Sequence, residues 1–371
     1  MRLRLLTLSL ISAMTMTACA SNVSSQSNLE ASKASEPARL QQSEQISKPL
    51  PKVDPTTKAE RTGLAERADV QAFITKTSRE KNLDAKWMTD VLNHTKLQPK
   101  IVEAMNRPAE GTMNWGKYRP IFMTDKRIND GIKFYNQYES DFIRAEEVYG
   151  VDRFVIAAII GVETGYGQNR GSWKVVDALS TLAFDYPRRA AFFSGELAAF
   201  FQILNENGGD PFSYKGSYAG AMGYPQFMPS SYLAYAVDFD GDGKRDLWNN
   251  PVDAIGSVGN YLMKAGWVRG AKIAEQVSVS TSNNAYQALK QTGRLTPPKE
   301  TVAQLKNAGI ITNADPSAKV TLFEFEVTSS PKVDEWWIGY RNFYAITRYN
   351  SSKLYALAVF QVSEAIKKGV R

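Results

Sequence analysis

Between residues 63 and 269, apolar residues recur at helical spacing in one segment after another, so this region must fold mainly as packed helices. A long pattern of this kind runs through residues 128–149 and stops at Gly150. The expected caps or first residues of other helices are Asp84, Asp152, Ser194 and Pro251. A closing helix is expected over about 352–368. These patterns predict a protein in which helices are in the majority.

The sequence changes character after Gly270, where short stretches alternate between apolar and polar residues. The alternating apolar residues are Val277, Val279, Phe323, Phe325 and Val327. The aromatic segment 336–346 also has the composition of an extended chain in part. We therefore expect a small β-containing insertion over roughly 270–338, and an α+β fold class that is mainly α.

The first residues have the order of an export signal. Arg2 and Arg4 precede the apolar run 5–16, which is too short to span a membrane, and small residues then lead to Cys19. This order resembles a bacterial lipoprotein signal, in which Cys19 would be lipidated and become the mature N-terminus. A cleaved export signal with an incidental cysteine is the alternative, but the one cysteine of the chain falls at this site.

The segment 19–62 is rich in polar residues and proline and has no apolar period. Such a segment cannot bury enough apolar surface to offset its ordering entropy, so we expect a disordered tether. Ala20 and Ser21 follow Cys19, and no aspartate stands at the position that retains lipoproteins in the inner membrane. The expected location is the periplasm, with the acylated Cys19 inserted in the inner leaflet of the outer membrane.

The residue counts restrict the possible chemistry. Cys19 and His94 are single residues of their types, so no intramolecular disulfide and no structural zinc site of Cys and His ligands can form. A His-based nucleophile triad would have to use His94. The net charge of +7 favours an acidic partner, such as peptidoglycan carboxylates, anionic lipid or nucleic acid. No dense Lys/Arg run or nucleic-acid motif is present, so we expect no nucleic-acid partner.

The segment 161–171 contains a glutamate, Glu163, at the end of the apolar run 155–162. A carboxyl group at the end of such a helix is partly desolvated, which disfavours its ionised form. Cleavage of a glycosidic bond needs a protonated carboxylic acid, because the leaving oxygen must receive a proton. Gly165 and Gly167 would end the helix and leave room for a polymer. The alternative is a polar residue at an ordinary helix C-terminus.

A second segment, 216–232, combines glycines, amide and hydroxyl groups, and aromatic rings. Pyranose rings stack on aromatic faces and their hydroxyls bond to amides, so this composition suits the lining of a sugar groove. A buried glycine-rich loop next to a helix that starts near Pro229 would have the same composition. By itself this segment does not distinguish a sugar-binding groove from a buried loop.

Together the two segments resemble the lysozyme-like lytic transglycosylase superfamily, in which a helix-end glutamate is followed by a G-A-M-G-x-x-Q-F element. The longer sequence around both segments, together with Arg348 to Asn350, resembles the B-type membrane-bound lytic murein transglycosylases over roughly residues 63–371. The resemblance implies a lysozyme-like catalytic core. It also implies that Glu163 is the catalytic residue, which protonates the bond between N-acetylmuramic acid and N-acetylglucosamine in peptidoglycan.

The resemblance further implies that no water is consumed. Glu163 would then take the proton of the muramic C6 hydroxyl, which closes a 1,6-anhydro ring. The positions implied to bind substrate are Ser217, Gln226, Tyr118, Arg188, Arg189, Tyr261, Tyr349, Asn350 and Tyr355. Arg188 and Arg189 would hold peptide-stem carboxylates, unless they are a solvated surface pair, and the tyrosines could instead be core residues. Conventional glycosidases need a second carboxylate, and Asp177 and Asp185 are the downstream acids to compare.

The acidic segment 238–246 matches the start of an EF-hand calcium loop. The expected ligands there are Asp238, Asp240, Asp242 and the carbonyl of Lys244. Asn249 stands at position twelve instead of a glutamate, and the transglycosylase resemblance implies a longer loop that Asp253 closes. A structural Ca²⁺ is expected, because clustered carboxylates repel one another without a cation. The alternative is a metal-free turn rich in Asp and Asn.

The expected organisation is as follows: a signal peptide at 1–18, the tether at 19–62, a helical subdomain at 63–135, a catalytic core with the EF-hand-like loop at 136–269, a small β-containing subdomain at 270–338, and a return segment and helix at 339–371. The favoured function is a lytic transglycosylase that acts as a monomer on glycan strands. The alternatives are a hydrolytic muramidase on the same fold and a non-catalytic, calcium-stabilised peptidoglycan-binding lipoprotein.

Overall fold

The computed structural model describes residues 62–106 and 113–370. The expected signal peptide, Cys19 and the tether as far as residue 61 lie outside these described residues. Among the helices that are described, none is long and apolar enough to cross a membrane.

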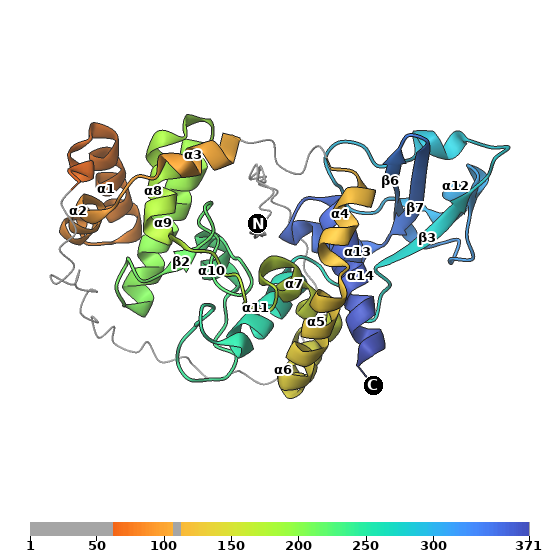
Figure 1. The fold of residues 1–371 in the computed structure, drawn as a ribbon, viewed down its shortest axis with the longest axis horizontal. Helices are drawn as coiled ribbons and strands as arrows, with labels where there is room; N and C mark the ends of the chain where they lie inside the picture. The colour runs from red at the N-terminus through yellow and green to blue at the C-terminus, as the bar shows by residue number, and fades with distance from the viewer. Residues whose placement is uncertain (1–61, 107–112, 371) are drawn as a thin grey trace, which may run out of the picture.

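One group of helices joins the start of the described chain to a later helical hairpin (Figure 1). It comprises α1 (Ala68–Lys81), α2 (Ala85–His94), α3 (Pro99–Asn106), α8 (Val175–Asp185) and α9 (Ala190–Asn207). Helix α8 packs along α9, while α3 packs on α8 and α1 on α9. The predicted cap of α2 is confirmed, because Asp84 accepts hydrogen bonds from the backbone N–H groups of Lys86 and Trp87.

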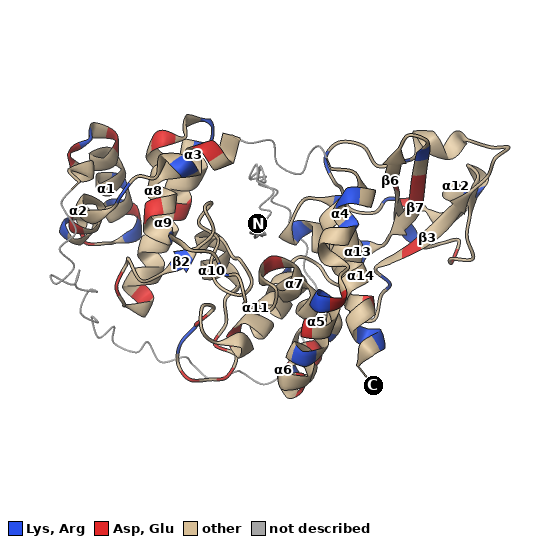
Figure 2. Ribbon diagram, viewed as in Figure 1, with Lys and Arg blue, Asp and Glu red and all other residues tan. Residues whose placement is uncertain are grey.

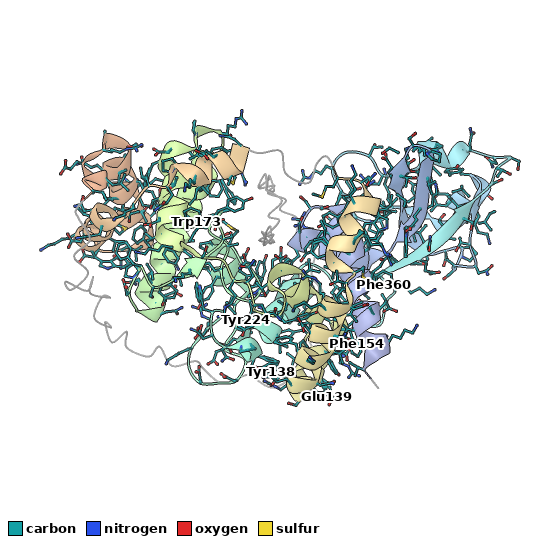
Figure 3. All side chains as sticks on the ribbon, viewed as in Figure 1. Tyr138, Glu139, Phe154, Trp173, Tyr224 and Phe360 are labelled. Carbon is teal, nitrogen blue, oxygen red and sulfur yellow. The ribbon has the colours of Figure 1, made fainter. Side chains whose placement is uncertain are left out.

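A second group of helices surrounds α7 (Arg153–Thr164). Its members are α4 (Trp115–Phe122), α5 (Asp125–Gln137), α6 (Glu139–Tyr149), α11 (Pro251–Lys264) and α14 (Lys353–Gly369). Four of them, α5, α6, α11 and α14, pack directly on α7. Figure 3 shows Phe154, near the start of α7, among side chains of this group, where its ring stacks on Tyr135 of α5. Every residue from Phe154 to Gly161 is buried, so α7 is the centre of this core.

A small antiparallel sheet packs beside α4. Its strands are β3 (Ala274–Val279), β4 (Glu300–Thr301), β5 (Ile310–Ile311), β6 (Lys319–Ser329) and β7 (Lys332–Gly339), in the order β4-β6-β7-β3-β5. Its apolar face forms a separate cluster with α12 (Val302–Asn307). The remaining strands and α-helices of the described residues are β1 (Trp173–Lys174), β2 (Lys215–Gly216), α10 (Pro229–Tyr235) and α13 (Arg341–Tyr349). The predicted fold class, α+β and mainly α, is confirmed.

The prediction that Ser194 caps a helix is wrong. Helix α9 already begins at Ala190, directly after the 3₁₀ turn Pro187–Arg189, so Ser194 lies inside it. Phe193, one residue earlier, is buried between its neighbours and extends the apolar face of the helix toward its N-terminus. Burial of this face outweighs the capping preference of serine, because most helical stability in proteins comes from tertiary packing.

The aromatic segment 336–346 is extended only as far as Gly339, where β7 ends. Helix α13 then begins at Arg341 and buries Phe343 and Ile346 on one face. Its aromatic residues are typical of strands, and this composition hid the helical period. The pattern over 128–149 likewise divides into α5 and α6, which meet at Tyr138.

Two glycines make room for Tyr166, which follows α7 in the left-handed conformation with φ 62°. A Cβ atom at Gly161 would lie 2.5 Å from the Tyr166 ring, and one at Gly131 of α5 would collide with its hydroxyl. Such contacts are too short for either alanine to fit without displacing the tyrosine. The end of α7 therefore depends on glycine at both positions.

We expect Gly161→Ala to destabilise the protein by about 1–3 kcal/mol through overpacking. Gly195→Ala in α9 is the matched control, because nothing lies within 4 Å of a Cβ atom at that position. That control should stabilise the protein by up to about 1 kcal/mol, since alanine is the better helix former. Urea unfolding followed by circular dichroism measures both changes. Equal stabilisation by the two substitutions would contradict the packing described for Tyr166.

Candidate active site

Glu163 is the second-last residue of α7 and is half-buried. The helix is capped as predicted by Asp152, whose carboxylate accepts hydrogen bonds from the N–H groups of Phe154 (2.8 Å) and Val155 (3.3 Å). It ends at Gly165, whose φ of 59° is the left-handed conformation of a helix C-cap. The central helix thus places a half-buried carboxyl group at its C-terminal end.

A tyrosine from the last helix holds this carboxyl group. The hydroxyl of Tyr355 donates a hydrogen bond of 2.7 Å to Oε1 of Glu163. Tyr355 lies on α14, one turn after the cap Ser352, and is only 2% exposed. Burial and the nearby charge of Glu163 raise the pKa of Tyr355 well above its usual value. The phenol therefore remains a protonated hydrogen-bond donor, and it orients the carboxyl group.

A cluster of aromatic rings continues from Tyr355. The ring of Tyr349 lies parallel to that of Tyr355 at 6.4 Å, and Tyr261 contacts Tyr349 at 4.7 Å between ring centroids. Their hydroxyls donate to backbone carbonyls, Tyr349 to Pro225 and Tyr261 to Arg348. Burial raises the pKa of both phenols, and the charge of Glu163 contributes at Tyr349. These rings form a fixed wall next to the carboxyl group.

The segment 161–171 is joined to the glycine-rich segment by three direct contacts. The hydroxyl of Thr164 lies 3.0 Å from the carbonyl oxygen of Tyr224, which is labelled in Figure 3. The side-chain amide of Gln226 donates to the carbonyl of Arg170 at 3.3 Å. Gly167 packs against the ring of Tyr224, where a Cβ atom would collide. The two segments that the sequence singled out therefore form one site.

Two polar side chains of the glycine-rich segment are buried in this region. The hydroxyl oxygen of Ser217 accepts hydrogen bonds from the N–H groups of Ala219 and Ala221, which fixes the turn. Gln226 adopts the left-handed conformation, with φ 51°. Its Nε2 atom is bonded, whereas its buried Oε1 atom accepts no hydrogen bond within the described residues. A buried acceptor of this kind is costly unless a ligand or water supplies a donor.

The other predicted site residues lie in several places. Tyr118 of α4 is fully buried and lies near enough to Tyr355 to affect its pKa. Asn350 ends α13 and accepts a hydrogen bond from the Ser352 N–H group. Arg188 and Arg189 lie in the 3₁₀ turn between α8 and α9, in the other helix group, where Arg189 stacks over Phe192. Their substrate roles remain predictions.

The two downstream aspartates have structural partners. The carboxylate of Asp177 accepts a hydrogen bond from the Lys96 N–H group at 3.1 Å, which ties α8 to the loop before α3. Asp185 forms an ion pair with Arg67 at 2.8 Å. Both interactions lie within the first helix group, so they hold that group together.

The acidic loop follows α10. One carboxylate oxygen from each of Asp238, Asp240 and Asp253 lies within 4.8 Å of the others. Burial and the two neighbouring aspartates raise the pKa of Asp253 to about 6. Oxygen-only ligands suit a hard cation such as Ca²⁺, and these residues therefore fit one.

Asp253, which the longer pattern implies as a ligand, packs against this loop. Asp253 accepts hydrogen bonds from the N–H groups of Phe239 and Asp246, which places it against the start of the loop. Asn249 instead donates to Asp246. Asp242 accepts from the Lys244 N–H group and is not part of the three-carboxylate cluster.

The sequence did not single out Thr164 or Phe227. Thr164 connects the two segments, and Phe227 packs against both Tyr261 and Tyr349. Both residues lie within the segments 161–171 and 216–232, so their position was a signal. Their contacts depend on tertiary structure, which spacing does not reveal.

The chain is similar to proteins whose names describe cleavage of the bacterial cell wall. Residues 65–364 match the family model "Transglycosylase SLT domain". The chain is 39% identical over 317 residues to membrane-bound lytic murein transglycosylase B of Escherichia coli (strain K12), and the match covers 82% of this chain and 84% of that protein.

Two solved structures are also similar. The Escherichia coli lytic transglycosylase Slt35 in complex with calcium matches with a TM-score of 0.74 and 38% identity, over 86% of this chain and 99% of that one. SltB3 from Pseudomonas aeruginosa in complex with NAG-anhNAM-pentapeptide matches with a TM-score of 0.69 and 29% identity, over 80% and 78% of the two chains.

We expect Thr164→Val to lower the free energy of unfolding by about 1–3 kcal/mol, because the buried partners of its hydroxyl lose a hydrogen bond. Thr89→Val in α2 is the matched control. Both hydroxyls bond the carbonyl four residues earlier, but Thr89 is only half-buried and its side chain makes no hydrogen bond to another segment of the described residues. That control should change stability by less than about 0.5 kcal/mol. Denaturant unfolding curves measure the stability of both variants. Equal losses would contradict the role of the Thr164 hydroxyl in connecting the two segments.

Proposed function

Because the chain belongs to the transglycosylase SLT family and is a peptidoglycan lytic transglycosylase, we propose that Glu163 is both the acid and the base of its reaction. The observation that carries this proposal is the hydrogen bond of 2.7 Å from the buried Tyr355 to a half-buried carboxyl group at the end of α7. A group with this environment and a fixed orientation suits general acid catalysis. The lysozyme-like fold of the structural neighbours also supports the end of α7 as the place of the reaction.

The proposed reaction conserves atoms without water. Glu163 gives its proton to the oxygen between N-acetylmuramic acid and N-acetylglucosamine, and the C1–O bond breaks. The resulting carboxylate takes the proton of the C6 hydroxyl while the C6 oxygen bonds to C1. A 1,6-anhydro ring forms, and Glu163 is protonated again for the next cycle. The anhNAM-containing ligand of SltB3 supports this product.

The substrate-binding roles are proposals of the same kind. Tyr355 orients the carboxyl group, and Tyr349 and Tyr261 provide apolar faces for sugar rings. The buried Oε1 atom of Gln226 is free to accept a hydrogen bond from a sugar hydroxyl or amide. The remaining proposed contacts are Tyr118, Ser217, Asn350, Arg188 and Arg189. The two arginines would hold peptide-stem carboxylates.

The location and the subdomain limits also remain proposals. The name of the Escherichia coli relative describes it as membrane-bound, which supports acylation of Cys19 and attachment to the periplasmic face of the outer membrane. The proposed parts are the helical subdomain at 63–135, the core at 136–269, the β-containing subdomain at 270–338 and the return segment at 339–371. We propose that the enzyme acts as a monomer.

We propose that the acidic loop binds a structural Ca²⁺ through Asp238, Asp240 and Asp253, with Asp242 and Lys244 supplying further oxygen atoms. The carboxylate cluster and the calcium complex of Slt35 support this assignment. The ion would neutralise three acids and fix the loop between α10 and α11. It would take no part in proton transfer.

We expect Glu163→Gln to lower the rate of release of soluble fragments from purified sacculi by about 10²–10⁴-fold, because the amide cannot donate the catalytic proton. Glu364→Gln on the exposed side of α14 is the control and should keep wild-type activity. Circular dichroism should show both variants folded. Undiminished activity in Glu163→Gln would remove this residue from the mechanism.

Calcium should raise the melting temperature of the wild-type protein, because an ion that binds only the folded state stabilises it. Asp240→Ala should abolish this rise by removing one carboxylate of the cluster. Asp315→Ala is the matched control, since Asp315 is also an exposed aspartate in a turn but lies in the β-containing part. Differential scanning calorimetry measures the shifts. An unchanged melting temperature in millimolar calcium would contradict the assignment.

A further inference from the structure

A pocket of about 620 Å³ lies between the end of α9, the β1–β2 ribbon and the acidic loop. Its volume is in the range that proteins use for small ligands. The residues that line it include Arg170, Glu206, Tyr214, Lys215, Lys244 and Trp248. The proposed reaction at Glu163 uses none of these side chains, so the pocket needs a separate explanation.

Aromatic side chains form one fixed wall of this pocket. Trp248 and Tyr214 meet edge to face with ring centroids 4.8 Å apart. The indole N–H of Trp248 donates to the Lys215 carbonyl at 3.0 Å, and the Tyr214 hydroxyl donates to the Gly208 carbonyl at 3.0 Å. Both rings are therefore held in place before any ligand arrives, which reduces the entropy cost of binding.

Around the pocket, two acidic groups have bonding partners, whereas two lysine ammonium groups bond to none of the described residues. Glu206 forms an ion pair with Arg245 at 2.7 Å, and Asp246 accepts hydrogen bonds from the N–H groups of Trp248 and Asn249. The ammonium groups of Lys215 and Lys244, by contrast, form no ion pair or hydrogen bond with any residue in 62–106 or 113–370. Figure 2 shows basic and acidic positions side by side on the loop that carries Lys244.

These exposed cations are available to an anionic ligand. Arg170 adds a third positive charge, and its guanidinium stacks over Tyr224 at 4.9 Å. The acids of the pocket already have other partners. A ligand carboxylate could therefore pair with these lysines without breaking an existing ion pair.

The pocket adjoins the proposed sugar site along two short stretches of chain. Arg170 lines the pocket, and its carbonyl accepts the hydrogen bond from Gln226. Lys215 also lines the pocket, and Ser217 follows two residues later, about 7 Å along an extended chain. A peptide that branches from a sugar near Ser217 and Gln226 could reach the lysines.

We propose that this pocket is a second binding site, for the acidic peptide stem of peptidoglycan. Stem carboxylates other than those proposed to meet Arg188 and Arg189 bind Lys215 and Lys244, and the apolar parts of the stem lie on Trp248. The inference rests on the proposed function for its substrate class. It adds a site that selects strands carrying peptides and that is separate from the reacting bond.

The experiment uses the full-length mature protein with Glu163→Gln, so that no substrate is consumed, and with calcium present throughout. One probe is the GlcNAc–MurNAc disaccharide bearing a tripeptide stem, and the other is the same disaccharide without peptide. The readout is the ¹⁵N-labelled indole resonance of Trp248, which Trp248→Phe identifies. We expect this resonance to shift with the peptide-bearing probe alone.

Charge reversal at the pocket tests the lysines. Lys215→Glu and Lys244→Glu should each weaken binding of the peptide-bearing probe about fivefold or more. Lys76→Glu on the exposed face of α1 makes the same change in net charge and should leave affinity unaltered. Titration of the Trp248 resonance gives each affinity.

Three results would overturn the proposal: an unmoved Trp248 resonance, an equal shift with the peptide-free sugar, or unchanged affinity in both lysine variants. Failure of the proposed function is a different outcome. It would appear as full activity of Glu163→Gln on sacculi, whether or not the Trp248 resonance moves.

Discussion

The burial of α7 is the constraint on which the rest of the structure depends. Four helices pack around it, and every residue from Phe154 to Gly161 is buried. A helix so enclosed can present a functional group only at its end, which is where Glu163 stands. Because α14 is one of the enclosing helices, the C-terminal part of the chain must fold back before Tyr355 can reach that carboxyl group.

The nearest described neighbours of the Glu163 carboxyl group include uncharged phenols. The buried phenols of Tyr355 and Tyr349 lie near the carboxyl group of Glu163, and burial raises their pKa values well above the usual value of a tyrosine. The hydroxyls are therefore neutral hydrogen-bond donors and not competing acids. Asp177 and Asp185 are committed to the first helix group through Lys96 and Arg67. This arrangement is consistent with the proposed reaction, in which one carboxyl group acts twice and the substrate supplies the nucleophile.

The sequence predicted the parts of the fold that depend on local chemistry. Asp84 and Asp152 were identified as caps because a short acidic side chain before an apolar face has few other roles. Ser194 failed as a cap because burial of Phe193 extended α9 past it. Helix α13 was missed because strand-forming aromatics occupy its buried face. In both cases tertiary packing outweighed a local preference.

The candidate site was predictable in composition but not in geometry. Two motifs, far apart in the chain, indicated Glu163 and the glycine-rich segment. That Thr164 and Gln226 join them, and that an acceptor of Gln226 stays unsatisfied, follow only from three-dimensional contacts. The pocket beside Trp248 gave no signal in the sequence, because its lining comes from four separate segments.

Digestion of purified sacculi in oxygen-18-labelled water tests the central claim most directly. If Glu163 drives ring closure by the muramic C6 hydroxyl, mass spectrometry will find anhydro ends that are lighter by one water than hydrolysed ends and that carry no label. Labelled reducing ends as the main product would contradict the account, because they would show that water, and not the substrate, attacks the sugar.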